Sequence, residues 1–443
     1  MRNLMLMIFV MGMFQAQTAR AMDVMEAYEL ALAQDPQLRA AHFQHDAVRE
    51  TVRQAWANFL PDVNASVEIG HVFQDVVDSD NRVYAQERAD YLSKQYTIQL
   101  VQPVFYLQHF YTLSQSKTTL NRADFELLAA EQYLLLRVAD AYFSILLAQD
   151  EITALQEEEA AIRLHYQVAS EKNKKGLAPL IDVYDAEARL EEVLAERVEA
   201  ERVLASAKEG LAEIVGDYPI CVNPMKPGFH PLSPDPDELE SWLGISRIKN
   251  AVLLIKRLES MEYAEEIKRQ RSAHVPTVEL IGRWNRDDTD GSLYSGGSTV
   301  NSFQVMGRVS IPLYSGGIIE SRVRESMALY QKALKEVISQ ERQAVRQVTD
   351  AFYGTKSAAR RALAAEKSIK SQTLSLEARK IGYQAGRYDS LSVLDAIRDL
   401  ATDKKNFNTF HYQHIIEFMK LKYQAGGLTV SDLEQINAML DRP

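Results

Sequence analysis

The chain has little cysteine, no long apolar run after its first 21 residues and no excess of basic charge. Its 443 residues include one cysteine, Cys221, which excludes an intrachain disulfide. After Ala21 no segment approaches 18 consecutive apolar residues, so the sequence predicts no transmembrane helix there. The formal net charge of −11 disfavours nucleic acid as a partner.

The N-terminal residues 1–21 have the pattern of a secretory signal peptide. Arg2 precedes an apolar segment from Leu4 to Phe14, and Ala19-Arg20-Ala21 matches an Ala-x-Ala cleavage site. We therefore expect an exported protein that begins at Met22, with a net charge of −13 once Arg2 and Arg20 are lost. The alternative is a membrane anchor, but the apolar segment is shorter than the about 20 residues that span a bilayer.

Two parts of the chain match each other at a spacing of 210 residues. The matched residues are Gly176 and Gly386, Val183 and Val393, Asp185 and Asp395, Ala186 and Ala396, and Leu190 and Leu400. Upstream, Ala141-Tyr-Phe143 matches Ala351-Phe-Tyr353 at the same spacing. A repeat of this length indicates a duplicated half-protein, so each functional feature is expected twice.

Four segments alternate between apolar and polar residues: 62–73, 93–104, 276–286 and 302–313. In the first, Val63, Val67 and Ile69 share one face, and Asn64 and Ser66 lie on the other. This period of two predicts strands, and their length suits tilted strands that cross a membrane. A small soluble β-sandwich is the alternative that the pattern leaves open.

The remaining chain is predicted to be helical, with unusually long helices. No proline or glycine occurs between Tyr106 and Lys175, which allows about 100 Å of continuous helix. Apolar residues recur every seven positions, which is typical of coiled coils. This register contains Leu113, Leu120, Leu127, Leu134, Ala141, Ala148, Leu155, Ile162 and Ala169.

Gly176 and Gly386 occur where each long helix must end. A helix then restarts near Asp182 in the first copy and near Asp389 or Ser390 in the second, so each half contains a helical hairpin. The predicted fold class is therefore α+β, with long antiparallel helical hairpins and four strands. Four strands cannot close a barrel, and open edges are not tolerated in lipid, so the barrel must be completed by further copies of the chain. Three copies would supply twelve strands, within the range of known barrels.

Several motifs resemble the TolC family of outer-membrane exit ducts. They are Leu60-Pro61, Val275-Pro276, Ile311-Pro312-Leu-Tyr-Ser-Gly-Gly317 and the segment from Gly386 to Ala396. The resemblance implies a homotrimer whose β-barrel crosses the outer membrane and whose helical barrel extends into the periplasm. It also implies a periplasmic adaptor and an inner-membrane transporter of the ABC or RND type as partners, with outer-membrane lipid around the barrel. No enzymatic activity and no cofactor are expected.

The resemblance divides the mature chain into two structural repeats and two connecting segments. The repeats are 22–215 and 247–423, each with a helix, two strands and a helical hairpin. The segments 216–246, which is rich in proline, and 424–443 would form an equatorial region.

The resemblance also places a periplasmic gate at the hairpin tips. The residues assigned to it are Asp182, Asp185, Tyr383, Arg387 and Asp395. Ser392 stands where the family has a second carboxylate and Tyr388 where it has an arginine, so either Arg387 substitutes for that arginine or this duct closes less firmly. Capping of a helix N-terminus is the alternative role for these aspartates, Asp182 above all.

The tips themselves resemble sites at which the family docks its adaptor. These residues are Lys175, Gly176, Leu177, Ala178, Ala385, Gly386 and Arg387. Two groups, His42 with His45 and Asp46, and His411 with His414, have spacings that could hold a metal, but such residues on amphipathic helices usually pack or face solvent. We expect no metal site.

The sequence leaves a second function open, an exported coiled-coil scaffold or adaptor that never enters a membrane. It does not indicate whether the cargo of a duct is protein, drug or metal ion.

Overall fold

The computed structural model describes residues 21–75, 77, 88–216, 220–228, 230–293 and 296–441. The predicted signal peptide lies outside these residues except for Ala21. Contacts divide the chain into two compact units, which are described separately below. One contains Met1–His42, Leu127–Leu253 and Glu341–Pro443, and the other contains Phe43–Glu126 and Leu254–Gln340.

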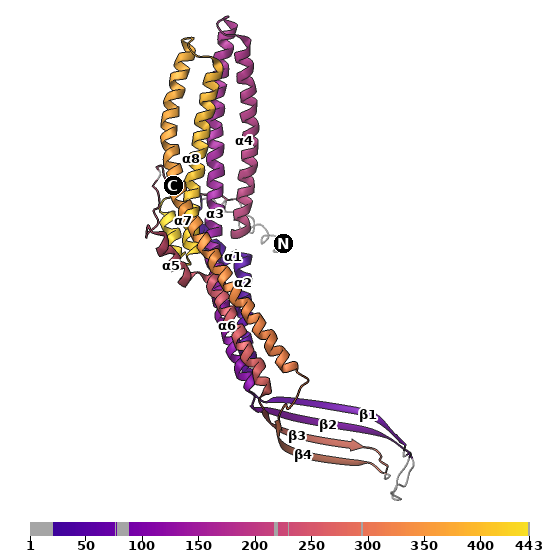
Figure 1. Ribbon diagram of the computed structural model, residues 1–443. Coiled ribbons are helices and arrows are strands. Elements are labelled where there is room, and N and C mark those ends of the chain that lie inside the picture. The colour runs from indigo at the N-terminus through magenta and orange to yellow at the C-terminus, as the bar shows by residue number, and fades with distance from the viewer. Residues whose placement is uncertain are drawn as a thin grey trace, which may run out of the picture. The chain divides into compact units, whose positions relative to one another are not determined.

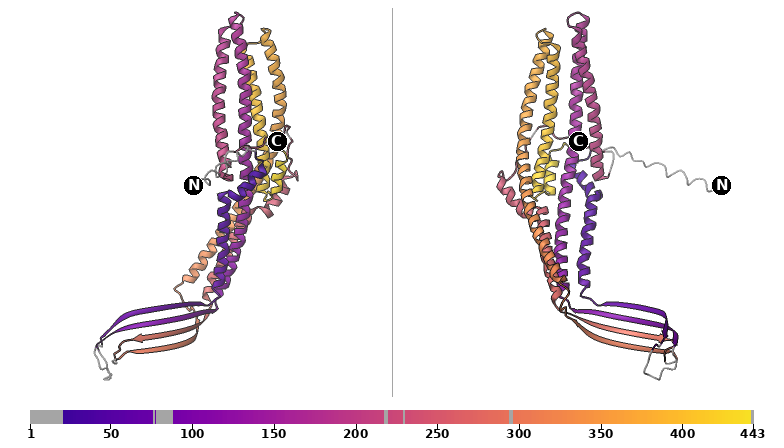
Figure 2. Two further views of the ribbon diagram at one scale, coloured as in Figure 1. Left: turned by 180° about the vertical axis from the view of Figure 1, so that it is seen from behind. Right: turned by 45° about the vertical axis from the view of Figure 1, so that its right-hand side comes forward.

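The second unit contains a four-stranded antiparallel sheet in the order β1-β2-β3-β4 (Figure 2). The strands are β1 (Asp62–Asp75), β2 (Arg88–Phe105), β3 (Thr277–Thr289) and β4 (Ser298–Ser310). All four segments predicted as strands are strands. β2 begins before the predicted residue 93, because Arg88 pairs with Asp75, and β4 ends before the predicted residue 313.

The sheet has one apolar and one polar face, as the alternation predicts. Val67 lies opposite Tyr96, and Trp284 lies between Ile98 and Phe303 on the same face. On the other face, the Arg283 guanidinium donates hydrogen bonds of 3.2 and 2.7 Å to Gln99. The apolar side chains remain exposed: Val63, Val67, Ile69, Phe73, Ile98, Phe303, Val305 and Val309 are each at least 47% accessible to solvent.

Prolines lie close to the ends of the strands, where a missing N–H costs little. Pro61 and Pro276 immediately precede β1 and β3. Pro103 lies inside β2, near its end, where the pairing register shifts between Pro103 and Phe105. The shift accommodates a residue that cannot donate to the ladder.

Helices α2 (Pro36–Ala57) and α6 (Ala251–Arg271) precede the two strand pairs, and a short 3-10 turn (Ser272–His274) follows α6. In this unit α6 is tied to the first part of the next helix, α3 (Leu107–Lys174), by Arg122, which bonds Glu262 at 2.7 Å. None of the helices in the described ranges is both long and apolar enough to cross a membrane.

Two helical hairpins follow the strand pairs (Figure 1). The first consists of α3 (Leu107–Lys174) and α4 (Leu180–Val215), and the second of α7 (Ile318–Gln384) and α8 (Ser390–Gln424). The predicted uninterrupted helix before Gly176 is confirmed by the 68 residues of α3.

Packing in the first unit follows the seven-residue register. Leu134, Leu155, Ile162 and Ala169 are almost fully buried. In α4 the more deeply buried stripe contains Ala186, Val193 and Ala200, while Val183 and Leu190 of the neighbouring stripe are only partly buried. Small residues on this stripe allow the helices to approach closely.

Three short helices and irregular segments complete this unit: α1 (Val24–Gln34), α5 (Leu239–Lys249) and α9 (Val430–Asn437). The described part of the proline-rich segment that precedes α5 is irregular apart from isolated bridges between Met22 and Val222 and between Met225 and Leu440. Buried Tyr142 of α3 holds this segment in place, since the Tyr142 hydroxyl accepts a 3.0 Å hydrogen bond from the Asn223 amide.

Candidate functional site at the hairpin tips

The two hairpin tips have the same backbone geometry. Gly176 and Gly386 adopt left-handed conformations with φ of 70° and 73°. The amide of the next residue then bonds back to the carbonyl five positions earlier, Leu177 to Lys172 at 2.8 Å and Arg387 to Gly382 at 2.7 Å. This Schellman arrangement satisfies helix-terminal carbonyls and favours glycine, which has no Cβ, at the left-handed position.

The second helix of each hairpin begins differently. α8 is capped by Asp389, whose carboxylate accepts a 2.9 Å hydrogen bond from the Ser392 amide. α4 has Pro179 at its N-cap, and no side chain bonds there. The capping alternative for Asp182 is therefore wrong, because Asp182 lies inside the first turn of α4 and its carboxylate is used elsewhere.

Asp182 and Tyr383 connect the two hairpins. The Tyr383 hydroxyl on α7 donates a 3.3 Å hydrogen bond to the Asp182 carboxylate on α4. Partial burial raises the pKa of Asp182, and the nearby charge of Asp185 raises it further, while the bond from Tyr383 partly opposes both effects. The structure thus brings together three of the five residues assigned to the gate.

The other two assigned residues lie apart from this contact within one chain. Arg387 is exposed, and its guanidinium forms no hydrogen bond or ion pair with any residue that the structure describes. Asp395 is half-exposed and lies 3.5 Å from Arg398, one turn along α8. The ring of Tyr388, which occupies the position of the family's arginine, packs against Gly382, where an added Cβ would come within 2.2 Å of it.

Two residues of α3 outside the predicted site, His165 and Lys172, also contact the second hairpin. Lys172 donates a 2.8 Å hydrogen bond to the Tyr383 carbonyl, and His165 shares a 2.7 Å hydrogen bond with the Ser390 hydroxyl. A signal was present in the sequence, because His165 and Lys172 each lie three residues after the register positions Ile162 and Ala169. In a coiled coil such positions face the partner helices.

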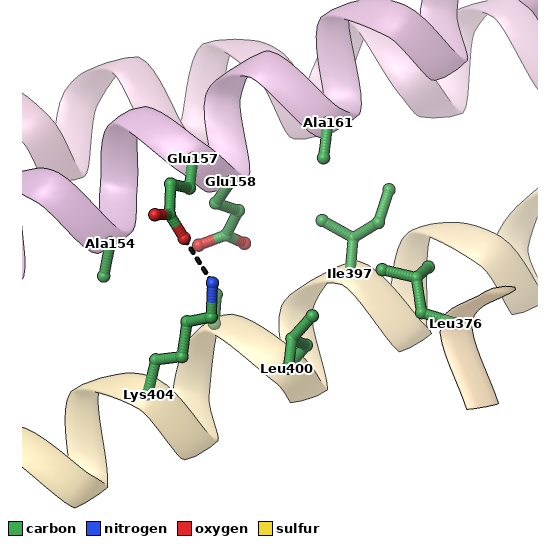
Figure 3. A pocket seen from close by; sticks show the side chains of 9 residues that line it. Ala154, Glu157, Glu158, Ala161, Leu376, Ile397, Leu400 and Lys404 are labelled. Atoms are coloured by element: carbon green, nitrogen blue, oxygen red, sulfur yellow. Dashed lines mark hydrogen bonds and ion pairs between the residues drawn. The ribbon is translucent and has the colours of Figure 1, made fainter. Parts of the chain in front are cut away.

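Further from the tips, ion pairs join the hairpins. Figure 3 shows Glu157 of α3 reaching Lys404 of α8 beside a cavity of about 50 Å³, toward which Glu158 also projects. Lys405 pairs with Glu196 of α4 at 3.1 Å. Burial raises the pKa of Glu158. Together with the tip contacts, these pairs attach α8 to both helices of the first hairpin.

Two of the histidines considered as metal ligands, His45 and His414, have other partners. His45 pairs with Asp124 at 2.8 Å. His414 contacts the Thr355 carbonyl with Nδ1 and accepts from the Leu232 amide with Nε2, so both ring nitrogens face backbone groups. In the described part of the chain, no three His, Cys, Asp or Glu side chains come together as a metal site would require.

Comparisons with known proteins agree with this architecture. The family model described as "Outer membrane efflux protein" matches residues 27–217 and 243–427. The chain is 29% identical to the outer membrane protein TolC of Vibrio cholerae, with 95% of this chain and 94% of that protein covered. It is 27% identical to the proteases secretion protein PrtF of Dickeya chrysanthemi, with 99% and 95% covered.

Solved structures show the same fold at lower sequence identity. The outer membrane channel CmeC of Campylobacter jejuni matches with a TM-score of 0.80 at 17% identity, covering 94% of this chain and 90% of that one. The chain therefore belongs to the outer membrane efflux protein family and is an exit duct of the outer membrane.

Proposed function

We propose that three copies of this chain form a continuous duct that receives substrates from an inner-membrane pump through a periplasmic adaptor. The observation that carries the proposal is the sheet, which combines an exposed apolar face with two open edges. In the described residues, β1 pairs only with β2, and β4 only with β3. Lipid does not tolerate unpaired strand edges, so edge-to-edge association of copies is required for insertion.

The number three rests on the family resemblance and on barrel size. Three sheets of four strands give twelve, an even number within the range of outer-membrane barrels. A scaffold or adaptor that never enters a membrane would leave the apolar face of the sheet, including Val67 and Phe303, exposed to water. Exposed apolar patches of this kind mark surfaces that contact a membrane or a partner protein.

Protein is the cargo that we favour. PrtF and the alkaline protease secretion protein AprF of Pseudomonas aeruginosa are both named for secretion of proteases. AprF is 26% identical to this chain, with 99% of this chain and 92% of AprF covered. The transporter would then be of the ABC type, which serves type I secretion. An RND-type pump and drug efflux are the second possibility, because a duct accepts what its pump delivers.

The tips are the gate in this proposal. The contact between Tyr383 and Asp182 holds the hairpins together in one chain, and Asp185, Arg387 and Asp395 face equivalent residues of neighbouring copies around the entrance. Arg387 is available for such a contact because its side chain is exposed. Carboxylates repeated around a narrow opening attract cations.

The exposed tip residues are the docking surface for the adaptor. Leu177 is 74% exposed, and Lys175, Ala385, Gly386 and Arg387 are also exposed. Gly176 and Ala178 complete this surface. A notional Cβ at either tip glycine meets nothing within 4 Å, so larger side chains there would obstruct a partner without clashing inside the chain.

Reconstitution in planar bilayers tests the duct. The mature protein should run as an oligomer in unheated detergent gels, fractionate with outer membranes and conduct ions. Asp395→Asn should lower the preference for cations, and Arg398→Gln, which frees the Asp395 carboxylate from its ion pair, should increase it. A monomer that never conducts would contradict the proposed function, and unchanged selectivity in both variants would remove Asp395 from the gate.

A further inference from the structure

Tyr383 is held on several sides by side chains of the first hairpin. Its hydroxyl bonds Asp182 of α4 at 3.3 Å. The Lys172 amino group lies 4.0 Å from the centroid of its ring, and the His165 ring centroid lies 5.0 Å away. Tyr383 itself is only 5% exposed, so these groups enclose it almost completely.

Lys172 makes two favourable contacts with the end of α7. Its amino group donates a 2.8 Å hydrogen bond to the Tyr383 carbonyl, which also accepts from the Gly386 amide at 3.1 Å. A cation at the C-terminus of a helix is stabilised by the partial negative charge of the terminal carbonyls. The same amino group lies over the Tyr383 ring at a distance that allows a cation–π interaction.

His165 holds the beginning of α8 in a similar way. Its Nε2 and the Ser390 hydroxyl are 2.7 Å apart, and both side chains are buried. Ser390 is the first residue of α8, and Tyr383 lies in the last turn of α7. His165 and Lys172, on one face of α3, therefore contact both helices of the second hairpin beside its tip.

We propose that His165 and Lys172 form a clasp that keeps the second hairpin against the first and so holds the duct closed, together with the bond between Tyr383 and Asp182. This proposal rests on the proposed function of the tips as a gate. The clasp places the positive charge on the first hairpin, where it acts on a backbone carbonyl and an aromatic ring. Opening requires that Lys172 leave both contacts and that Ser390 separate from His165.

Burial of His165 makes the clasp sensitive to acid. Burial, together with the charges of Lys380 of α7 and Lys172 of α3, lowers the pKa of His165 from 6.5 to about 4. The nearby carboxylates are engaged elsewhere, Asp182 of α4 with Tyr383 and Asp389 with Ser392. A histidine released by opening regains its ordinary pKa, so the open form binds more protons between pH 6.5 and 4, and acid favours opening.

Asp182 has the opposite effect at lower pH. Its pKa is raised in the closed form, so protonation of this carboxyl favours closure as the pH approaches its titration range. The acid response of His165 must therefore be isolated with a variant. His165→Gln keeps a neutral side chain that can bond Ser390 and cannot be protonated.

The test uses single-channel recording of the assembled full-length mature protein. Lys172→Met should shift the closed-to-open equilibrium toward open by about tenfold, since loss of a hydrogen bond with a charged donor typically has this effect or more. Lys172→Arg should stay mainly closed. The matched control is Lys174→Met, because Lys174 is in the same helical turn but, among the residues that the structure describes, pairs only with exposed Glu171 at 3.0 Å.

The outcomes separate the clasp from the gate. If Asp182→Ala opens the channel and Lys172→Met does not, the clasp is wrong and the gate stands. If none of the variants conducts differently from the parent protein, the gate itself is wrong. Opening should increase as the pH falls from 6.5 toward 4 in the parent protein and lose this dependence in His165→Gln, and identical pH profiles would overturn the role of His165.

Discussion

The hydroxyl of Tyr383 donates a hydrogen bond to the carboxylate of Asp182, 201 residues earlier in the chain. The two residues come from the second and first hairpins, so the bond measures whether the hairpin tips are together. Deletion of a single atom, the hydroxyl oxygen of Tyr383, breaks this contact without disturbing the surrounding packing.

Tyr383→Phe should therefore increase conductance while the oligomer stays intact. Loss of one hydrogen bond of about 0.5–1.5 kcal/mol should raise the open-to-closed ratio by roughly twofold to tenfold. Planar-bilayer recordings measure this ratio. Tyr353→Phe on the same helix is the control, because Tyr353 is exposed and outside the tips. Equal conductance of Tyr383→Phe and the parent protein would show that this contact does not limit opening.

Substitution of the tip glycines should separate stability from export. Gly176→Ala and Gly386→Ala should each cost about 1–2 kcal/mol of unfolding free energy, because their backbones are left-handed and no neighbour obstructs the methyl group. Gly176→Phe and Gly386→Phe should in addition abolish export while oligomers still form. Thermal unfolding and secretion assays give the two readouts.

Gly210 provides the control for these substitutions. It lies within α4, and a notional Cβ there meets nothing within 4 Å, so Gly210→Ala should increase stability by up to about 1 kcal/mol. Normal export by both phenylalanine variants would show that the tips do not dock the adaptor.

Neighbouring residues of β1 should respond oppositely to a charge. Val67 lies on the apolar face and Ser66 on the polar face of the sheet. Val67→Arg should destabilise the inserted barrel by about 2–4 kcal/mol per subunit if it lies near the bilayer midplane, whereas Ser66→Arg should change stability little. Refolding into lipid vesicles measures the difference, and equal effects would contradict the assignment of faces.

His414 should stabilise the proline-rich segment through its two backbone contacts. His414→Leu removes the hydrogen-bond partner that the imidazole provides to the Leu232 amide and the Thr355 carbonyl. The substitution should lower the unfolding free energy by about 3 kcal/mol. Exposed His230 of the same segment is the control, and His230→Leu should have little effect. Urea titration followed by circular dichroism measures both.

The same histidine should make stability depend on pH. Burial lowers the pKa of His414 below its ordinary value of 6.5. As the pH falls below 6.5, the unfolded chain binds a proton that the folded chain resists, so the unfolding free energy decreases. This part of the acid sensitivity should disappear in His414→Leu, and its persistence would show that His414 is not responsible.

Much of the fold could be predicted because its signals are local. The alternation of Val63, Asn64 and their neighbours marks a strand with two unlike faces, and the absence of proline and glycine before Lys175 allows a helix of 68 residues. Strand ends were less accurate. Ser298 joins β4 through its pairing with Thr289, and such pairing depends on a partner strand rather than on the residue itself.

The contacts between the hairpin tips were predicted only in part. Asp182 and Tyr383 were assigned by resemblance to a family, whereas neither His165 nor Lys172 was predicted to contact the second hairpin. Their position three residues after Ile162 and Ala169 places them on the packed stripe, but nothing local identifies Ser390, 225 residues away, as the partner of His165.

The sequence by itself determined the duplicated plan, the two faces of the sheet and the glycine-ended hairpins, because each depends on residue periodicity or on one backbone conformation. The tertiary structure alone decided which side chains meet between the hairpins. It made Asp182 a partner of Tyr383 instead of a helix cap, and it placed Lys172 at the end of α7. These contacts depend on how far one hairpin is shifted along the other, and a seven-residue repeat fits several such shifts almost equally well.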